Sequence, residues 1–237
     1  ADFTVDAGSD AGIIKPLLGI NIGPYPATVG VTVDTLGPYK DLGVTQVRTH
    51  DFYGPVDMHE IYPDEFADPE NSTNYFFTNS DLRVEYIHNN GHEIFLRLGN
   101  SYDYGEPAHL ASPPSNTVNW IAAAGNVIRH YTEGKWDGFH YPLRYVEIWN
   151  EPDNPQFWGG TRVAFMQFFN QAATALKAEY PDLRIGGPGF APGSFLLGGT
   201  NVTEFLTYCR DNSVPLDFLS WHLYSDAPAD FKNAAVF

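Results

Sequence analysis

Short apolar runs alternate with amphipathic stretches over most of the chain. The runs are typical of strands buried on both faces, and in the stretches apolar residues recur every three or four positions, as on one face of a helix. The runs predict strands at 17–20, 45–48, 94–98, 145–149, 184–186 and 218–221. The stretches between them predict helices at 34–42, 82–90, 118–131, 165–180 and 202–209.

Residues that commonly begin or end helices flank two of these stretches. Ser80 precedes the helix predicted at 82–90 and Gly91 follows it, so we expect a serine cap at its start and a glycine at its end. Thr161 is the expected cap of the helix predicted at 165–180.

Strands that alternate with helices form parallel sheets with right-handed crossovers. We therefore predict one α/β domain over residues 1–237, a (β/α)8 TIM-type barrel with about six of its eight βα units, because strands seven and eight have no counterpart in the pattern. The competing doubly wound sheet would carry a Gly-x-Gly-x-x-Gly turn after its first strand, and none follows here. Polar and aromatic loops follow the predicted strands at 21–25, 49–53, 99–102, 150–153, 187–190 and 222–226, on the rim where such barrels carry their active sites.

Charge narrows the choice of partners. The chain has 13 basic and 29 acidic side chains, a net charge of −16, which repels phosphate backbones and anionic lipids. Nucleic acids and membrane surfaces are therefore not expected partners, and no apolar run approaches the ~18 residues of a membrane span. Neutral sugars are not penalised. The single cysteine, Cys209, fits a cytosolic protein and many bacterial secreted ones alike, and we favour a secreted or periplasmic location.

One strand end carries residues that suit glycoside cleavage. Such cleavage uses two carboxyl groups, one holding a proton for the leaving oxygen and the other attacking or stabilising the anomeric carbon. Glu151 follows the apolar run 145–149, and strand alternation would set Glu147, Trp149 and Glu151 on one face, toward the barrel interior. Aromatic walls there should raise the pKa of the Glu151 carboxyl and keep it protonated. Asn150 offers a donor and an acceptor to a sugar hydroxyl.

Four segments resemble a known family of enzymes. Residues 147–153, Glu-Ile-Trp-Asn-Glu-Pro-Asp, resemble the fourth-strand signature of the clan A glycoside hydrolases, which are retaining enzymes with (β/α)8 barrels. Residues 47–53, 95–99 and 217–224 resemble the second, third and sixth strand ends of glycoside hydrolase family 39, a β-xylosidase-like family. The resemblance extends over residues 17–226.

This resemblance implies an enzyme that cleaves β-linked glycans or glycosides by a retaining double displacement, with neither a cofactor nor a metal. Glu151 would be the general acid/base, and Asn150 would contact the 2-hydroxyl of the sugar. The other residues expected to contact an oligosaccharide or polysaccharide substrate are Arg48, His50, Trp149, His222 and Tyr224.

The second carboxylate of the family, a glutamate at the end of strand seven, has no counterpart here. Glu204 is the last glutamate in the sequence, and it falls in a predicted helix. We expect a remaining barrel segment or a partner chain to supply the nucleophile, and the 237-residue chain by itself to hydrolyse glycosides poorly. The alternative interpretation is a non-catalytic, carbohydrate-binding or degenerate barrel that keeps the aromatic rim without the second carboxylate.

Three further expectations concern residues around this rim. Glu147 should be a buried partner of Arg48 or Arg97. The segment 51–79 should influence substrate choice, and its acids and aromatic residues suit a neutral or basic glycan better than a uronate polymer. The nearby acids and histidines lack the spacing of known metal sites, so no metal is expected at His50, Asp51, Asp57, His59 and Glu60.

Overall fold

A single curled sheet of parallel strands organises the molecule. The computed structural model describes residues 18–26, 34–50, 54–101, 112–192, 194, 201–227 and 229. In this part of the chain six strands lie in sequence order across the sheet, each parallel to its neighbour. They are β1 (Gly19–Asn21), β2 (Gln46–Arg48), β3 (Glu93–Leu98), β4 (Tyr145–Ile148), β5 (Arg184–Phe190) and β6 (Phe218–Trp221). The prediction of a (β/α)8-type fold with six strands is confirmed.

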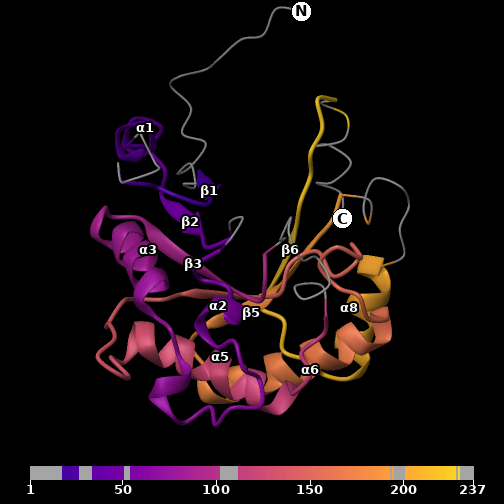
Figure 1. The fold of residues 1–237 in the computed structure, drawn as a ribbon. Coiled ribbons are helices and arrows are strands. Elements are labelled where there is room, and N and C mark those ends of the chain that lie inside the picture. Colours follow the sequence, from indigo (N-terminus) through magenta and orange to yellow (C-terminus); the bar gives the residue numbers. More distant parts are fainter. Residues whose placement is uncertain are drawn as a thin grey trace, which may run out of the picture.

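Helices follow the strands and cover the outer side of the sheet. Figure 1 shows α3, α5 and α6 along that side, with β1 and β6 at the two open edges of the curl. No helix among the described residues is both long and apolar enough to cross a membrane. The helices are α1 (Leu36–Asp41), α2 (Met58–Ile61), η1 (Ser72–Asn74), α3 (Thr78–Asn89), α5 (Thr117–Thr132), α6 (Arg162–Glu179) and α8 (Asn201–Asp211).

For α6 and α3, the structure confirms one predicted helix end each. Thr161 caps α6, because its side chain accepts a hydrogen bond from the backbone N–H of Ala164 at 3.1 Å. Gly91 follows α3 with a φ of +84°, a conformation that glycine adopts without strain. The serine cap was wrong: α3 begins before Ser80, whose hydroxyl donates to the Phe77 carbonyl one turn back at 2.9 Å.

The two faces of the sheet are buried to different degrees. Toward the helices, Val146 and Ile185 occupy paired positions on β4 and β5, and both are fully buried. Toward the inside of the curl, Phe95, Tyr145 and Phe218 form a cluster with ring centroids 5.4–5.8 Å apart. These three rings are only partly buried, because the described sheet ends at β1 and β6 and leaves that side of the interior open.

Candidate active site

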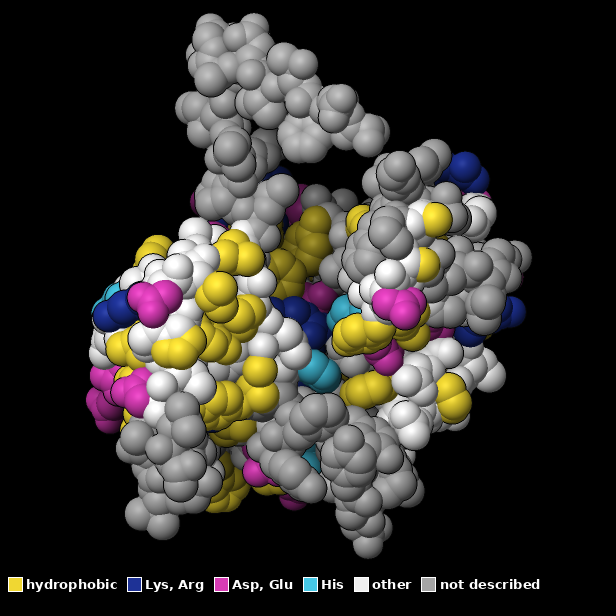
Figure 2. Space-filling view, turned by 90° about the horizontal axis from the view of Figure 1, so that it is seen from above, with side chains coloured by type: hydrophobic (Ala, Val, Ile, Leu, Met, Phe, Trp, Pro, Cys, Tyr) yellow, Lys and Arg dark blue, Asp and Glu magenta, His cyan; other side chains and the backbone are white. Residues whose placement is uncertain are grey.

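The residues that follow the strands meet at one end of the sheet. His50 lies two residues beyond β2, Asn150 and Glu151 just beyond β4, and His222 directly beyond β6. Carboxyl ends of parallel strands share one rim, so these side chains come together although they are far apart in sequence. Viewed from above, histidine and cationic side chains gather with acidic ones in a central hollow (Figure 2).

Glu151 is held in place by contacts to three segments. Its Oε1 accepts a hydrogen bond from Nδ1 of His222 at 2.5 Å, and its Oε2 accepts one from the Asn154 amide at 3.1 Å. Its backbone N–H donates to the carbonyl of Gly189 at 3.0 Å. The residue has a φ of +43°, so the chain leaves the strand geometry here and the carboxyl group turns toward β6.

The protonation preference of Glu151 differs from the expectation. Burial raises the pKa of its carboxyl group, but the hydrogen bonds from His222 and Asn154, with the positive charge of Arg48, outweigh burial and lower the pKa below its ordinary value. The prediction that aromatic walls keep this carboxyl protonated is therefore wrong for the described arrangement. The reason is that donors from other segments stabilise the carboxylate, and the local sequence does not reveal them.

Arg48 links three strands beneath the rim. Its Nε donates to Glu147 at 2.6 Å, one terminal nitrogen donates to the Asn150 carbonyl oxygen at 2.8 Å, and the other donates to Asn21 at 3.0 Å. The other oxygen of Glu147 accepts a hydrogen bond from the Ser220 hydroxyl at 2.5 Å. The prediction that Glu147 pairs with an arginine in the barrel layer is confirmed, with Arg48 as the partner.

Two buried nitrogens at the rim have no partner within the described part of the chain. They are the amide nitrogen of Asn150 and Nδ1 of His50. Arg48 donates a hydrogen bond to the side-chain oxygen of Asn150. The amide nitrogen of Asn150 is therefore left as a hydrogen-bond donor at the rim. Burial lowers the pKa of His50 well below its ordinary value, and the charges of Arg97, Arg48 and His222 lower it further, so the ring is neutral near pH 7.

Trp149 does not lie on this rim. Its side chain is only 1% exposed, and its ring packs against Trp158 and Phe168 at centroid distances of 5.1 and 5.6 Å, in the layer between sheet and helices. Its φ of +74° breaks the strand alternation, so Glu147 faces the interior while Trp149 faces the helices. The prediction that Trp149 contacts substrate is therefore wrong. Tyr224, which is 75% exposed, lies near His222 with ring centroids 6.2 Å apart, and its role stays a prediction.

Several residues of the site were not predicted from the sequence. Asn154 follows Glu151 by three residues, a spacing that a turn brings back onto the carboxylate, so this contact had a local signal. Ser220 and Asn21 had none, because their contacts depend on how β6 and β1 are placed relative to β4 and β2. Arg97, the other candidate partner of Glu147, instead forms a buried ion pair with Asp57.

The acidic and histidine side chains after β2 were considered above as possible metal ligands. Asp57 is occupied by Arg97 and Ser101, and Asp51 lies outside the described residues. Within the described ranges, no group of three or more acidic, histidine or cysteine side chains is arranged to hold a metal ion.

The rim opens onto a cavity inside the curl of the sheet. Its volume is about 230 Å³, which is enough for part of a small ligand. Polar side chains from β1, β2, β4 and β6 line it together with aromatic residues. These lining residues are Gly19, Ile20, Asn21, Gln46, Arg48, Phe95, Glu147, Ser220, Trp221 and His222.

The parallel half-barrel and the carboxylate–amide pair at one strand end agree with the matches below, which show the class of (β/α)8 glycoside hydrolases. The chain belongs to glycosyl hydrolases family 39, whose family model matches residues 33–236. It is 26% identical to a β-xylosidase of Caldicellulosiruptor saccharolyticus over 94% of this chain and 46% of that protein. It is also 26% identical to human α-L-iduronidase over 79% of this chain and 28% of that protein.

A solved structure shares the fold over most of the chain. The glucosidase from Croceicoccus marinus matches with a TM-score of 0.81 and 30% identity, over 95% of this chain and 48% of that one. The chain thus spans less than half the length of each of these relatives. The family resemblance is confirmed, and the roles of individual residues stay predictions.

Proposed function

We propose that this chain forms the acid/base side of the active site of a retaining glycosidase. The observation that carries the proposal is the pairing of two side chains at the end of β4. Glu151 presents a carboxyl group at the rim, and Asn150 presents an unpartnered buried donor beside it, held by Arg48. This combination offers an acid to a glycosidic oxygen and a donor to a neighbouring sugar hydroxyl.

The proposed reaction proceeds in two displacements. Glu151 donates its proton to the leaving oxygen while a nucleophilic carboxylate attacks the anomeric carbon, forming a glycosyl intermediate. Glu151 then removes a proton from water, which attacks the same carbon and releases the nucleophile. Asn150 would hold the sugar 2-hydroxyl, and the neutral ring of His50 would bind another hydroxyl of the same sugar. His222 would set the position of the Glu151 carboxyl group.

The nucleophile is proposed to come from outside the described strands. The cavity inside the curl is open between β1 and β6, where further barrel strands would lie in a closed (β/α)8 barrel. A carboxylate within roughly 4–6 Å of Glu151 would raise the pKa of Glu151, since two like charges resist ionising together. The acid form needed for the first displacement would then be populated when the nucleophile is present.

The proposed substrate is a neutral β-pyranoside of the xylose or glucose type. One support is the similarity to a β-xylosidase and to a glucosidase. A second is the net charge of −16, which disfavours acidic glycans and leaves neutral ones unaffected. The non-catalytic alternative predicts binding of the same sugars by the complete gene product without turnover.

Replacing Glu151 by glutamine in the complete gene product tests the proposal. Hydrolysis of an aryl β-xyloside or β-glucoside with a poor leaving group should fall by roughly 10²–10⁴-fold, because the general acid is lost. A dinitrophenyl glycoside, which needs little protonation to leave, should form the intermediate nearly as fast as before. Added azide should then intercept the intermediate and give a β-glycosyl azide, detected by NMR.

The matched control is Glu179→Gln, the same change at a surface ion pair with Arg129 on the helix layer. It should leave turnover unchanged. If Glu151→Gln retains full turnover on the poor leaving group, Glu151 is not the acid/base. If the unaltered protein binds these glycosides and never hydrolyses them, the non-catalytic alternative is correct.

A further inference from the structure

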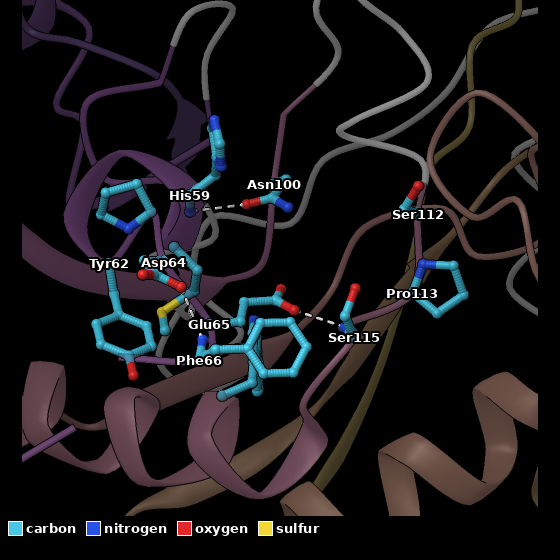
Figure 3. A pocket seen from close by; sticks show the side chains of 12 residues that line it. His59, Tyr62, Asp64, Glu65, Phe66, Asn100, Ser112, Pro113 and Ser115 are labelled. Atoms are coloured by element: carbon cyan, nitrogen blue, oxygen red, sulfur yellow. Dashed lines mark hydrogen bonds between the residues drawn. The ribbon is translucent and has the colours of Figure 1, made fainter. Parts of the chain in front are cut away.

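A second cavity lies beyond the carboxyl end of β3, and it shares no lining residue with the cavity inside the curl. It has a volume of about 280 Å³, close to the lower end of the range of about 300–1,000 Å³ for small-molecule pockets. Figure 3 shows His59 and Asn100 on one side of it, Ser112 and Pro113 on the other, and Glu65 reaching across to Ser115. The remaining lining residues are Met58, Tyr62, Pro63, Asp64, Phe66 and Trp120.

The wall between this cavity and the rim is held by specific contacts. The backbone N–H of Met58 donates to the Gly99 carbonyl at 3.0 Å, and that of His59 donates to the Asn100 side chain at 3.0 Å. Behind them, the buried Asp57 accepts hydrogen bonds from Arg97 and from Ser101. The cavity is therefore preformed, and it shares this wall with the strand ends that carry the proposed chemistry.

The surface of the cavity combines an aromatic face with polar edges. Phe66 lines the cavity and is 72% exposed, so its ring is accessible to a ligand there. The side chains of His59, Asn100 and Ser115 place donors and acceptors around it. An aromatic face with a polar edge is the chemistry of sugar binding, since a pyranose presents C–H groups on its faces and hydroxyls on its rim.

The negative charge at the cavity favours neutral sugars over acidic ones. Asp64 accepts a hydrogen bond from the backbone of Phe66, and Glu65 accepts one from the backbone of Ser115 at 2.5 Å, which fixes both carboxylates at the cavity. Neither lysine nor arginine is among the described residues that line it. Two carboxylates without a cation repel a uronate or a phosphate and accept hydrogen bonds from neutral hydroxyls.

We propose that this cavity is a second carbohydrate-binding site that takes a pyranose unit of a neutral glycan stacked on Phe66. This proposal rests on the proposed function in one respect, which is that the ligand is a glycan. It gives a structural basis to the expectation that the segment 51–79 influences substrate choice, because most of its lining residues come from that segment.

The test is a titration of the complete gene product carrying Glu151→Gln, which prevents turnover. Xylopentaose and cellopentaose are titrated calorimetrically into this protein and into a version that also carries Phe66→Ala. We expect the second change to remove one of two binding equivalents, or to weaken a single spanning event by at least about tenfold, about 1.4 kcal/mol.

Phe76→Ala is the matched control, because Phe76 is also exposed on the segment between β2 and α3 and does not line the cavity. It should leave stoichiometry and affinity unchanged, and Phe66→Trp should preserve binding because it keeps an aromatic face. A tri-galacturonate should not occupy the site. The inference is overturned if Phe66→Ala binds as its parent does, or if Phe76→Ala weakens binding equally.

The outcome is separable from that of the proposed function. Hydrolysis of an aryl glycoside by the protein with both Glu151 and Phe66 intact reports on the rim alone. Loss of binding in Phe66→Ala in a protein that hydrolyses nothing would support the second site and reject the enzyme. Unchanged binding after Phe66→Ala, in a protein that otherwise shows full turnover, would support the enzyme and reject the second site.

Discussion

At the scale of single residues, Arg48 determines how the rim is built. One guanidinium group contacts Asn21, Glu147 and Asn150, which belong to β1, to β4 and to the residues just beyond β4. The planar fork of arginine supplies these donors in fixed directions, which a lysine does not. By holding the oxygen of Asn150, Arg48 decides that the amide nitrogen is the group presented to a ligand.

His222 should control the protonation of Glu151. With His222→Ala the strongest hydrogen bond to the Glu151 carboxylate disappears while burial remains, so the pKa of Glu151 should rise. Asn154→Ala should raise it less, because Asn154 contributes less to the lowering. Carboxyl ¹³C NMR titration of the 237-residue chain measures both. An unchanged or lower pKa in His222→Ala would contradict the assignment.

The same contact has a consequence for stability. The pKa of Glu151 is lowered in the folded state, so this carboxylate stabilises the fold above its unfolded-state pKa of about 4.3. The contribution is lost as the pH falls through the lower, folded-state pKa. Urea unfolding should therefore separate the wild type from Asn154→Ala at pH 6, and the difference should shrink as the pH falls through the folded-state pKa of Glu151.

At the scale of elements, the helices follow from local sequence combined with one buried face. The apolar residues of α6 recur at helical spacing, and the deeply buried ones include Phe165, Phe169, Ala172 and Leu176. Their burial against the sheet stabilises the helix more than intrinsic propensity does. Its first turn depends on one side chain, Thr161.

Thr161→Ala should lower the free energy of unfolding by about 1 kcal/mol, because a backbone N–H at the start of α6 loses its acceptor. Thr161→Ser keeps the hydroxyl and should restore most of the loss. The backbone carbonyl of Thr161, which accepts a hydrogen bond from Trp158, is present in both variants. Equal stability of the alanine and wild-type proteins in urea unfolding would show that the cap contributes nothing.

At the scale of the whole molecule, the described sheet is a barrel with one open side. β1 and β6 have one strand neighbour each, and the interior rings of Phe95, Tyr145 and Phe218 are only partly covered. The carboxylate that completes the proposed reaction would enter from this side. On this proposal, activity would require the closed barrel, whereas Glu151 and its hydrogen-bond partners are already assembled in the open one.

The 237-residue chain by itself should hydrolyse aryl glycosides at least roughly 10³-fold more slowly than the complete gene product, because the proposed nucleophile is missing. Both proteins are assayed after intact-mass verification, which excludes contamination by a longer form. Full turnover by the 237-residue chain would mean that the nucleophile lies within it.

Much of the fold was predictable because its signals are local. The six strands and the main helices were predicted within a few residues of their observed bounds, since apolar periodicity acts over one element at a time. The short α2 and η1 were missed because neither is long enough to show a period. Asn150 and Glu151 were predicted as neighbours at a strand end because they are adjacent in sequence.

The amino-acid sequence by itself determined the order of strands and helices, the rim on which polar residues gather, and the carboxyl–amide pair at the end of β4. Only the tertiary structure decided which groups surround that pair. The partners of Glu147, Asn150 and Glu151 are 99, 102 and 71 residues away along the chain. Burial raises the pKa of Glu151, but the hydrogen bond from the distant His222 contributes to lowering it below its ordinary value. The tertiary structure also decided the direction of Trp149, because a positive φ at the strand end overrode alternation. Sequence patterns report the faces of single elements, whereas contacts across the sheet depend on register and on the curl that brings distant strand ends together.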